Sequence, residues 1–401
     1  MDRRLLLLWL TIFVDLIGFT LFIPVVPYFA ERVGASENMV MLSAAVFSLL
    51  VFLCSPIWGS LSDRVGRRPV IIISIIISAL SYLVFAHATS IILLFVSRIL
   101  TGIGSGNIAA AQAYVSDITE PKDRAKRIGL VVGASFGLAF AFGPAVGGFI
   151  YSHYGLEMLG YAAIGLCLLN LAGVIWALPE SLKDKDPTRT INFKPVASTF
   201  RSLKDPRFSD IFIIGFVYIT AFSMMNVSIA FLWQQKYGLD VDHVGLMFSV
   251  VGISSAIAQG GLVSVFQRLL GERKMMVYGC VCIGLGLAII PFVPQTWFVA
   301  FSLIPIILLA VGNACLNPSL LAILSRKAAP HELGEVLGQN QGFTSLGRVA
   351  GPAMAGPLYA AGMSLPFWVG GAIMLGTLYL VFDYLRTGYT PLPGASEHPA
   401  G

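Results

Sequence analysis

The chain has 401 residues, of which 56% are hydrophobic and only 12% are charged, whereas a soluble globular protein carries roughly 25% charged residues. This composition excludes a soluble protein and predicts an all-α integral membrane protein in contact with the lipid bilayer. The net charge of +5 does not indicate a nucleic-acid partner, because the Lys and Arg residues lie almost entirely in alternate loops.

Apolar stretches of about 18 residues or more predict membrane-spanning helices, and the sequence contains twelve. Short connections between them leave no room for a soluble catalytic domain. In chain order, the expected spans are 5–29, 39–61, 70–88, 90–116, 128–150, 157–178, 209–233, 241–265, 275–293, 297–324, 336–360 and 365–384.

The first span carries a carboxylate, Asp15, near its middle. A charge at that depth costs several kcal/mol, so an intramembrane acid indicates a functional site, with proton carriage as the leading role. On a continuous helix, Asp15 would share one face with Gly18, Phe19, Phe22 and Val26. The alternative is an acid that is neutralised by a neighbouring arginine and serves the structure alone.

Basic residues indicate the orientation of the spans. When the N-terminus is placed inside, most loop Lys and Arg residues fall on the cytoplasmic face, and only Arg32 and Lys236 lie on the opposite face. The positive-inside rule favours this arrangement. We therefore expect both termini in the cytoplasm and the chain in the plasma membrane, which for a bacterium is the inner membrane.

The second span ends in the sequence GSLSDRVGRR, residues 59–68. Gly59 permits close helix approach, Gly66 allows a tight turn, and Asp63 can form charge-assisted bonds with the arginines. The motif resembles the cytoplasmic signature of the major facilitator superfamily, G-x-L-a-D-r-x-G-r-r. The resemblance implies a gate that latches the outward-facing state, with Asp63 near the start of helix 11 and the arginines near an acid ending helix 4. The alternative is a basic loop that only fixes topology. The predicted gate comprises Gly59, Asp63, Arg64, Gly66, Arg67, Arg68, Asp117 and Arg348.

The fourth span contains Arg98, four residues before Gly102, and resembles the R-x-x-x-G pattern of the same superfamily. A buried guanidinium needs partners, and the candidates are Asp15, carbonyl groups of the first helix and Gln112. Asp15 and Arg98 are the expected proton-coupling pair. The alternative is a structural arginine bonded to backbone carbonyls.

The fifth span is rich in glycine and contains Pro144. Small residues at four-residue spacing let helices pack closely, and the proline bends the helix. The stretch resembles the helix 5 signature that marks antiporters within the superfamily, although packing alone would explain it. Its expected key residues are Gly137, Gly143, Pro144, Gly147 and Gly148.

A polar segment divides the spans six and six, and the two halves repeat one another weakly, as expected of a transporter built from two six-helix bundles. A solvated loop is favoured over an interfacial helix at 197–203. The expected domains are an N-terminal bundle at 1–178, a cytoplasmic linker at 179–208, a C-terminal bundle at 209–386 and a cytoplasmic tail at 387–401.

A substrate chamber is expected at the midplane between the bundles, lined by aromatic, methionine and amide side chains that suit varied amphipathic ligands. Some of these side chains would instead face lipid or neighbouring helices. With Asp15 ionised, Arg98 and Arg348 give a deep charge of +1, which weakens a purely cation-selective interpretation. The candidate lining residues are Phe19, Phe22, Gln112, Tyr218, Phe222, Met225, Asn226, Gln259, Asn313, Asn317, Asn340 and Gln341.

The sequence does not predict an enzyme. No nucleophile-base-acid set or phosphate loop is present, and all five cysteines fall within apolar spans, where Cys behaves as a small hydrophobe. Neither a metal nor an organic cofactor is expected, and the only coupling ion is the proton.

The residues around Asp15 resemble the first helix of the twelve-helix drug-proton antiporters, particularly the tetracycline and multidrug efflux branch. The resemblance implies a proton-coupled antiporter that exports an amphipathic small molecule. We separately expect the chain to function as a monomer. The chain departs from the tetracycline pattern because residues 275–293 contain no acid. The alternatives are an importer or lipid translocator that is not driven through Asp15 and, less favoured, a non-transporting receptor.

Overall fold

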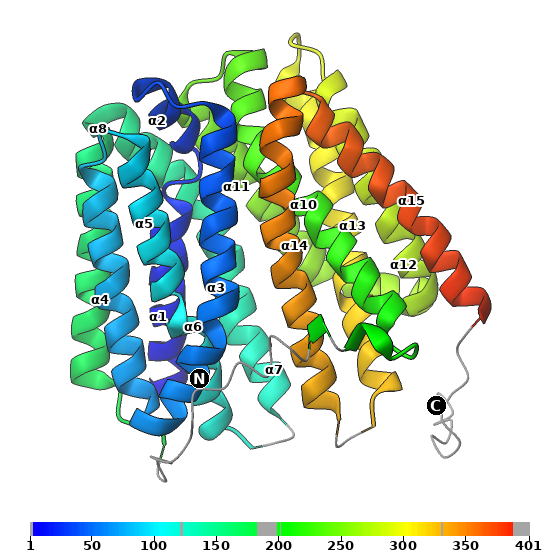
Figure 1. Cartoon of the computed structure of the whole chain (residues 1–401), viewed down its shortest axis with the longest axis horizontal. Coiled ribbons are helices and arrows are strands. Elements are labelled where there is room, and N and C mark those ends of the chain that lie inside the picture. Colours follow the sequence, from blue (N-terminus) through cyan, green and yellow to red (C-terminus); the bar gives the residue numbers. More distant parts are fainter. Residues whose placement is uncertain (1–2, 121–122, 183–198, 201, 330–331, 388–401) are drawn as a thin grey trace.

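The computed structural model describes residues 3–120, 123–182, 199–200, 202–329 and 332–387, and the regular elements within these ranges are helical. Figure 1 shows two groups of helices that converge at one end and spread apart at the other, where both α1 begins and α15 ends. The first group contains α1 (Arg3–Thr20), α2 (Val26–Arg32), α3 (Glu37–Val65), α4 (Arg67–Ala86), α5 (Ile91–Gly104), α6 (Gly106–Asp117), α7 (Arg124–Ile128), η2 (Gly129–Gly133) and α8 (Ala134–Ala177).

The second group begins after a short 3-10 turn, η3 (Ser202–Lys204), within the predicted linker. Residues 183–198 of that linker and 388–401 of the predicted tail lie outside the described residues. The second group contains α10 (Ser209–Tyr237), α11 (Val241–Ile257), η4 (Ala258–Leu262), α12 (Val263–Ile289), η5 (Ile290–Phe292), α13 (Phe298–Lys327), α14 (Leu333–Ala361) and α15 (Leu365–Thr387).

Twelve helical spans are present in the described part of the chain. Nine helices there are long and apolar enough to cross a membrane. One of the nine contains α8 and counts twice, because Gly155 has a left-handed φ of 82° and divides α8 into two helices. The shorter α1 and the more polar α14 bring the total from ten to twelve. The predicted fold class is confirmed.

The first span is not the single helix that was predicted for residues 5–29. Helix α1 ends at Thr20, and the next residues form turns with backbone hydrogen bonds three residues apart, such as Val25 N–H to the Phe22 carbonyl at 3.1 Å. Pro24 and Pro27 explain the break, because each lacks an N–H group and its ring crowds the preceding turn. The chain resumes a helical course in α2.

The fourth span is also interrupted, at Ser105 between α5 and α6. The indole N–H of Trp58 on α3 donates to the Ile103 carbonyl at 2.5 Å, two residues before this interruption. A side chain at Gly106 would overlap the same indole ring. Glycine thus lets α6 pass directly over Trp58, and the tight crossing accounts for the break.

Most of the apolar interior falls into two hydrophobic cores, one for each group of helices. The first includes Leu8, Ile12 and Tyr114, and the second includes Phe212 and Leu316, all fully or almost fully buried. A few second-group residues join the first core, namely Met224, Phe231, Val241, Ala355 and Tyr359. We call the two groups the N-terminal and C-terminal bundles.

Candidate functional site

The two bundles meet along a seam between α8 and α11. A Cβ atom added at Gly245 would lie 2.5 Å from the Pro144 carbonyl oxygen, and one added at Gly252 would lie 2.5 Å from the Phe140 carbonyl oxygen. Both distances are far below ordinary van der Waals contact. The backbones of the two bundles therefore touch directly, and only glycine fits at these two crossing points.

The seam opens further along the same helices. A Cβ at Gly137 would lie 3.8 Å from the Ala256 Cβ, which is ordinary contact, and one at Gly133 or Gly260 would meet nothing within 4 Å. The last two glycines belong to η2 and η4. Both are π-helical turns, which are rare and occur frequently at functional sites. The bundles are therefore in contact at one end, the closed end, and apart at the other, the open end.

Polar bonds hold the closed end. The Tyr28 hydroxyl of the N-terminal bundle donates to the Leu239 carbonyl oxygen at 2.6 Å. The Gln235 side chain on α10 donates to the Glu37 carboxylate at 2.7 Å and accepts from the Tyr359 hydroxyl at 3.0 Å. Each of the first two bonds crosses from one bundle to the other, so the closed end is sealed by side chains as well as by backbone packing.

The predicted antiporter motif of the fifth span contributes to this seal. Gly143 and Gly147 of α8 pack against Thr20 and the residue that follows it, at the end of α1. On another side of α8, a Cβ at Gly148 would lie 2.7 Å from the Val241 carbonyl oxygen of the C-terminal bundle. These glycines join α8 both to its own bundle and to the opposite one.

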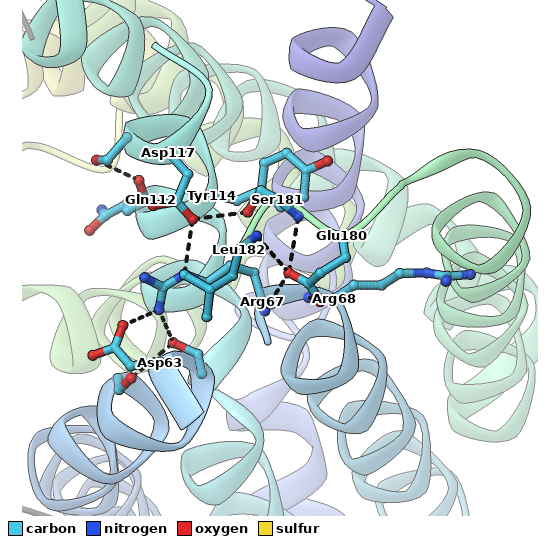
Figure 2. Close-up of polar contacts among 12 residues, drawn as sticks. Asp63, Arg67, Arg68, Gln112, Tyr114, Asp117, Glu180, Ser181 and Leu182 are labelled. Atoms are coloured by element: carbon cyan, nitrogen blue, oxygen red, sulfur yellow. Dashed lines mark hydrogen bonds and ion pairs between the residues drawn. The ribbon is translucent and has the colours of Figure 1, made fainter. Parts of the chain in front are cut away.

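A polar network centred on Arg67 lies between α3 and α4 (Figure 2). The guanidinium donates to Asp117 Oδ2 at 3.1 Å and to Ser62 Oγ at 2.7 Å, and it forms an ion pair with Asp63. The Ser181 hydroxyl also donates to Asp117 Oδ2, at 2.9 Å. Charge-assisted bonds of this kind are about twice as strong as neutral ones. The network joins the ends of α3 and α6 to the start of the linker.

The side chains of the remaining predicted gate residues have other surroundings. Arg64 is exposed, and the Arg68 guanidinium donates to the Ile175 carbonyl oxygen. Gly59 faces open space. Arg348, which sequence placed with the gate, lies on α14 of the C-terminal bundle and interacts electrostatically with a tyrosine of that bundle.

Glu180, which sequence reasoning missed, lies beside the Arg67 network (Figure 2). Its carboxylate accepts hydrogen bonds from the backbone N–H groups of Arg67 at 2.9 Å and Arg68 at 3.2 Å. It therefore caps the start of α4, where the helix dipole favours a negative charge. Gly66 is required beside it, because its φ is 114° and an added Cβ would overlap the carboxylate.

Removing the Glu180 carboxylate is expected to destabilise the N-terminal bundle. Glu180→Ala leaves two N–H groups at the start of α4 without their acceptor, and loss of a helix cap costs about 0.5–2 kcal/mol. The midpoint of thermal unfolding in lipid nanodiscs should fall for this variant. It should stay near the native value for Glu157→Ala, whose carboxylate is exposed on α8. Equal midpoints for the two variants would show that the cap contributes nothing.

Arg67→Gln is expected to lower stability further. Asp63 and Asp117 would then lie near each other without the guanidinium, and lost hydrogen bonds to charged groups cost about 1.5–3 kcal/mol each. The side chains of Asp63 and Asp117 are 21% and 24% exposed, so contact with water offsets part of that cost. The midpoint of thermal unfolding measures this loss of stability. The control is Arg64→Gln, which removes an exposed charge. An equal small shift of the midpoint in both variants would contradict the stabilising role of the network.

Asp15 lies on α1, half-buried among the other helices of the N-terminal bundle. It interacts electrostatically with Tyr82 of α4 and Cys167 of α8. Arg98 also interacts with Tyr82, and its guanidinium carbon lies 5.6 Å from the centroid of the Phe85 ring. Tyr82 therefore interacts electrostatically with both predicted proton-coupling residues. Neither aromatic side chain was among the partners that sequence predicted for Arg98.

Arg348 has its own polar surroundings in the C-terminal bundle. It interacts electrostatically with Tyr218 of α10, whose hydroxyl donates to the side-chain oxygen of Asn313 on α13. The Tyr218 and Phe222 ring centroids lie 6.2 Å apart on α10. The structure thus brings together four residues that sequence placed in two separate groups.

The candidate cavity residues differ in exposure. Phe22 is only 2% exposed and packs against Tyr82 and Phe85, with ring centroids 5.2 and 4.7 Å away. It does not line the space between the bundles in this conformation, because α1 ends before it and the predicted Asp15 face does not continue. The exposed candidates are Gln259, Asn317 and Gln341; the half-buried ones are Phe19, Gln112, Phe222, Asn226 and Asn313; the other buried ones are Tyr218, Met225 and Asn340.

Comparison with known proteins agrees with this architecture. Residues 8–338 and, in a second match, 211–400 fit the family model described as Major Facilitator Superfamily. The class C tetracycline resistance protein of Escherichia coli is 31% identical over 399 residues, covering 96% of this chain and 97% of that protein. Multidrug resistance protein 2 of Bacillus subtilis (strain 168) is 30% identical over 368 residues, covering 91% and 90%.

Solved structures share the fold. The crystal structure of the human organic anion transporter MFSD10 (TETRAN) matches with a TM-score of 0.70 at 24% identity, covering 94% of this chain and 99% of that one. The family match spans more than half of the sequence, and the first two relatives extend over nearly its whole length. The chain therefore belongs to the major facilitator superfamily.

Proposed function

We propose that this chain exports an amphipathic small molecule in exchange for protons, by opening alternately to the two faces of the membrane. As a superfamily member it is a membrane transporter and not an enzyme, and relatives named for tetracycline and multidrug resistance support a drug as the substrate. The coupling to protons rests on this chain's own residues.

Asp15 is the observation that carries the proposal. It stands twelve residues after the start of α1, which corresponds to a depth of about 18 Å. The other carboxylates of the described helices lie near a helix end or a kink. A single acid held at this depth is costly, and proton carriage is the role that accounts for it.

The open end faces the cytoplasm in this proposal. Basic residues gather at the loops of that end and are sparse at the closed end, where Arg32 and Lys236 lie, so the positive-inside rule supports this orientation. The described conformation is then inward-facing, and both termini are cytoplasmic. The basic residues of the open-end loops include Arg64, Arg67, Arg68, Arg268, Arg273 and Lys274.

In the proposed cycle, Asp15 takes up a proton from outside and releases it into the cytoplasm. Protonation removes the negative charge that offsets Arg98, so the interior of the N-terminal bundle changes from neutral to positive. Tyr82, which interacts electrostatically with both groups, is placed to respond to that change. Substrate binding favours the deprotonated form, and proton and substrate therefore occupy the transporter in turn.

The gate acts in the opposite, outward-facing state. There the open end closes, and the glycines that now face empty space, including Gly59, Gly133 and Gly260, allow the helices to approach. Asp63 then lies near the start of α14. The Arg67 network and the Glu180 cap hold the connection between α3 and α4 in the conformation that this contact needs.

Transport into everted membrane vesicles tests the proposal. With an acidic lumen, the native chain should accumulate tetracycline or an amphipathic dye inside the vesicles, and a proton uncoupler should release it. Accumulation that ignores the pH gradient would contradict proton coupling. Accumulation only in right-side-out vesicles would instead favour the importer.

A further inference from the structure

The deep charges are divided unequally between the two bundles. Asp15 and Arg98 lie in the N-terminal bundle and both interact electrostatically with Tyr82. The deep charges of this bundle therefore sum to zero when Asp15 is ionised. Arg348 lies in the C-terminal bundle. Within the described residues, no carboxylate forms an ion pair with it. The C-terminal bundle therefore carries an unbalanced positive charge at membrane depth.

Arg348 points toward the space between the bundles. Gln341, Arg348 and Ala355 are seven residues apart on α14, so they share one face of that helix. Ala355 is fully buried within the hydrophobic core of the N-terminal bundle, which fixes the direction of this face. Gln341 and Arg348, nearer the open end, are exposed. The same face is thus packed against the N-terminal bundle at the closed end and uncovered where the bundles part.

The neighbours of Arg348 add hydrogen-bond donors. The Tyr218 hydroxyl donates to the side-chain oxygen of Asn313, which leaves the Asn313 amide N–H groups as the available part of that side chain. The guanidinium supplies five more N–H donors in a planar fork. Phe222, half-buried on α10 beside Tyr218, supplies an aromatic surface. A positive charge, several donors and an aromatic ring therefore occur together.

A guanidinium fork binds anionic groups with paired oxygens, such as carboxylate, sulfonate or phosphonate, more tightly than it binds neutral or cationic groups. We propose that Arg348 binds the anionic head of the exported molecule, so that the substrate is an amphipathic organic anion or zwitterion whose apolar body lies against Phe222. This proposal rests on the proposed export function and narrows its substrate class. It also gives Arg348 a role in binding and not in the gate.

A charge series built on one fluorophore tests the assignment. The probes are dansylglycine, its neutral amide, and a dansyl derivative with a trimethylammonium group, so charge changes from −1 to +1 while the aromatic body is constant. Binding to the full chain in nanodiscs is measured by dansyl fluorescence. Native protein should bind the anion roughly tenfold or more tightly than the amide, as a hydrogen-bonded charge pair implies.

Substitutions then assign the preference to its residue. Arg348→Gln should remove the preference for the anion while binding of the neutral amide persists, which also shows that the variant is folded. Arg348→Lys keeps the charge and should retain part of the preference. The matched control is Arg386→Gln, which removes an exposed charge at the end of α15 and should leave all three affinities unchanged.

Three outcomes are distinguishable. A preference for the anion that disappears in Arg348→Gln supports the site. Equal binding of anion and amide, a preference for the cation, or a preference that survives Arg348→Gln would overturn it while leaving the export function intact. If none of the three probes binds or is exported, both this assignment and the proposed export of amphipathic molecules are contradicted.

Discussion

Asp15→Asn is expected to abolish accumulation driven by a pH gradient and, because the amide is uncharged like the protonated acid, to weaken substrate binding. Asparagine keeps the shape of the side chain and can still form hydrogen bonds near Tyr82, but it cannot take up or release a proton. Movement of substrate against its gradient needs that proton exchange. The variant should therefore only equilibrate substrate across the membrane, which the steady-state accumulation ratio in everted vesicles measures.

Two controls make the Asp15 result interpretable. Asp15→Glu keeps a titratable carboxyl group and should retain gradient-driven accumulation, although its longer side chain disturbs the packing. Exchange of labelled for unlabelled substrate without any gradient should survive in Asp15→Asn at saturating substrate, since it needs alternating access but no net proton movement. Full gradient-driven accumulation by Asp15→Asn would show that the acid is structural.

Gly252→Ala is expected to shift the transporter away from the described conformation, which is the inward-facing state in the proposed orientation. The new Cβ would lie 2.5 Å from the Phe140 carbonyl oxygen across the seam, so α8 and α11 must move apart for the closed end to form. Overpacking of this kind costs about 1–3 kcal/mol, which changes the ratio of two conformations roughly 5- to 150-fold. Distances between spin labels across the open end should therefore shorten, and transport should slow.

Gly260→Ala is the matched control for the seam. Its Cβ would meet nothing within 4 Å in this conformation, so it places no strain on the inward-facing state. It should leave the inward-facing population at least as large as in the native chain. If Gly252→Ala and Gly260→Ala gave the same label distances as the native protein, the seam would not control which end is closed.

The spans were largely predictable because hydropathy and length decide them. Their interruptions were not, because each depends on a partner from elsewhere in the chain. The break at Ser105 lies where α6 crosses Trp58 of α3, whose indole donates to the Ile103 carbonyl. The end of α1 at Thr20 had a visible signal in Pro24 and Pro27, but a long apolar run outweighed it in the prediction.

The Arg67 network was partly predictable for a similar reason. The resemblance to the superfamily signature placed the arginines near Asp117. Glu180 instead binds backbone N–H groups, which nearly every residue has and which leave no mark in the sequence. The sequence indicated Glu180 only as an acid directly after the sixth span. The N–H groups that it binds are more than one hundred residues away in the chain. Gly66, needed beside it, was singled out for its turn alone.

The surroundings of the deep charges needed three-dimensional packing. Sequence identified Asp15, Arg98 and Arg348 as unusual, because charges are rare in apolar spans. It could not show that Tyr82 interacts with the first two, or that Arg348 faces the space between the bundles, since both depend on how helices rotate about their axes. Those rotations are set by glycine contacts and aromatic packing, not by hydropathy.

Proton exchange is measurable without any imposed gradient. Purified protein is reconstituted into liposomes that hold a pH-sensitive dye, and substrate is added outside, with empty liposomes as the baseline. As substrate enters, protons should leave, so the lumenal pH should rise in proportion to uptake for the native chain and stay constant for Asp15→Asn. Substrate entry through the native protein with no change in lumenal pH would contradict proton-coupled antiport.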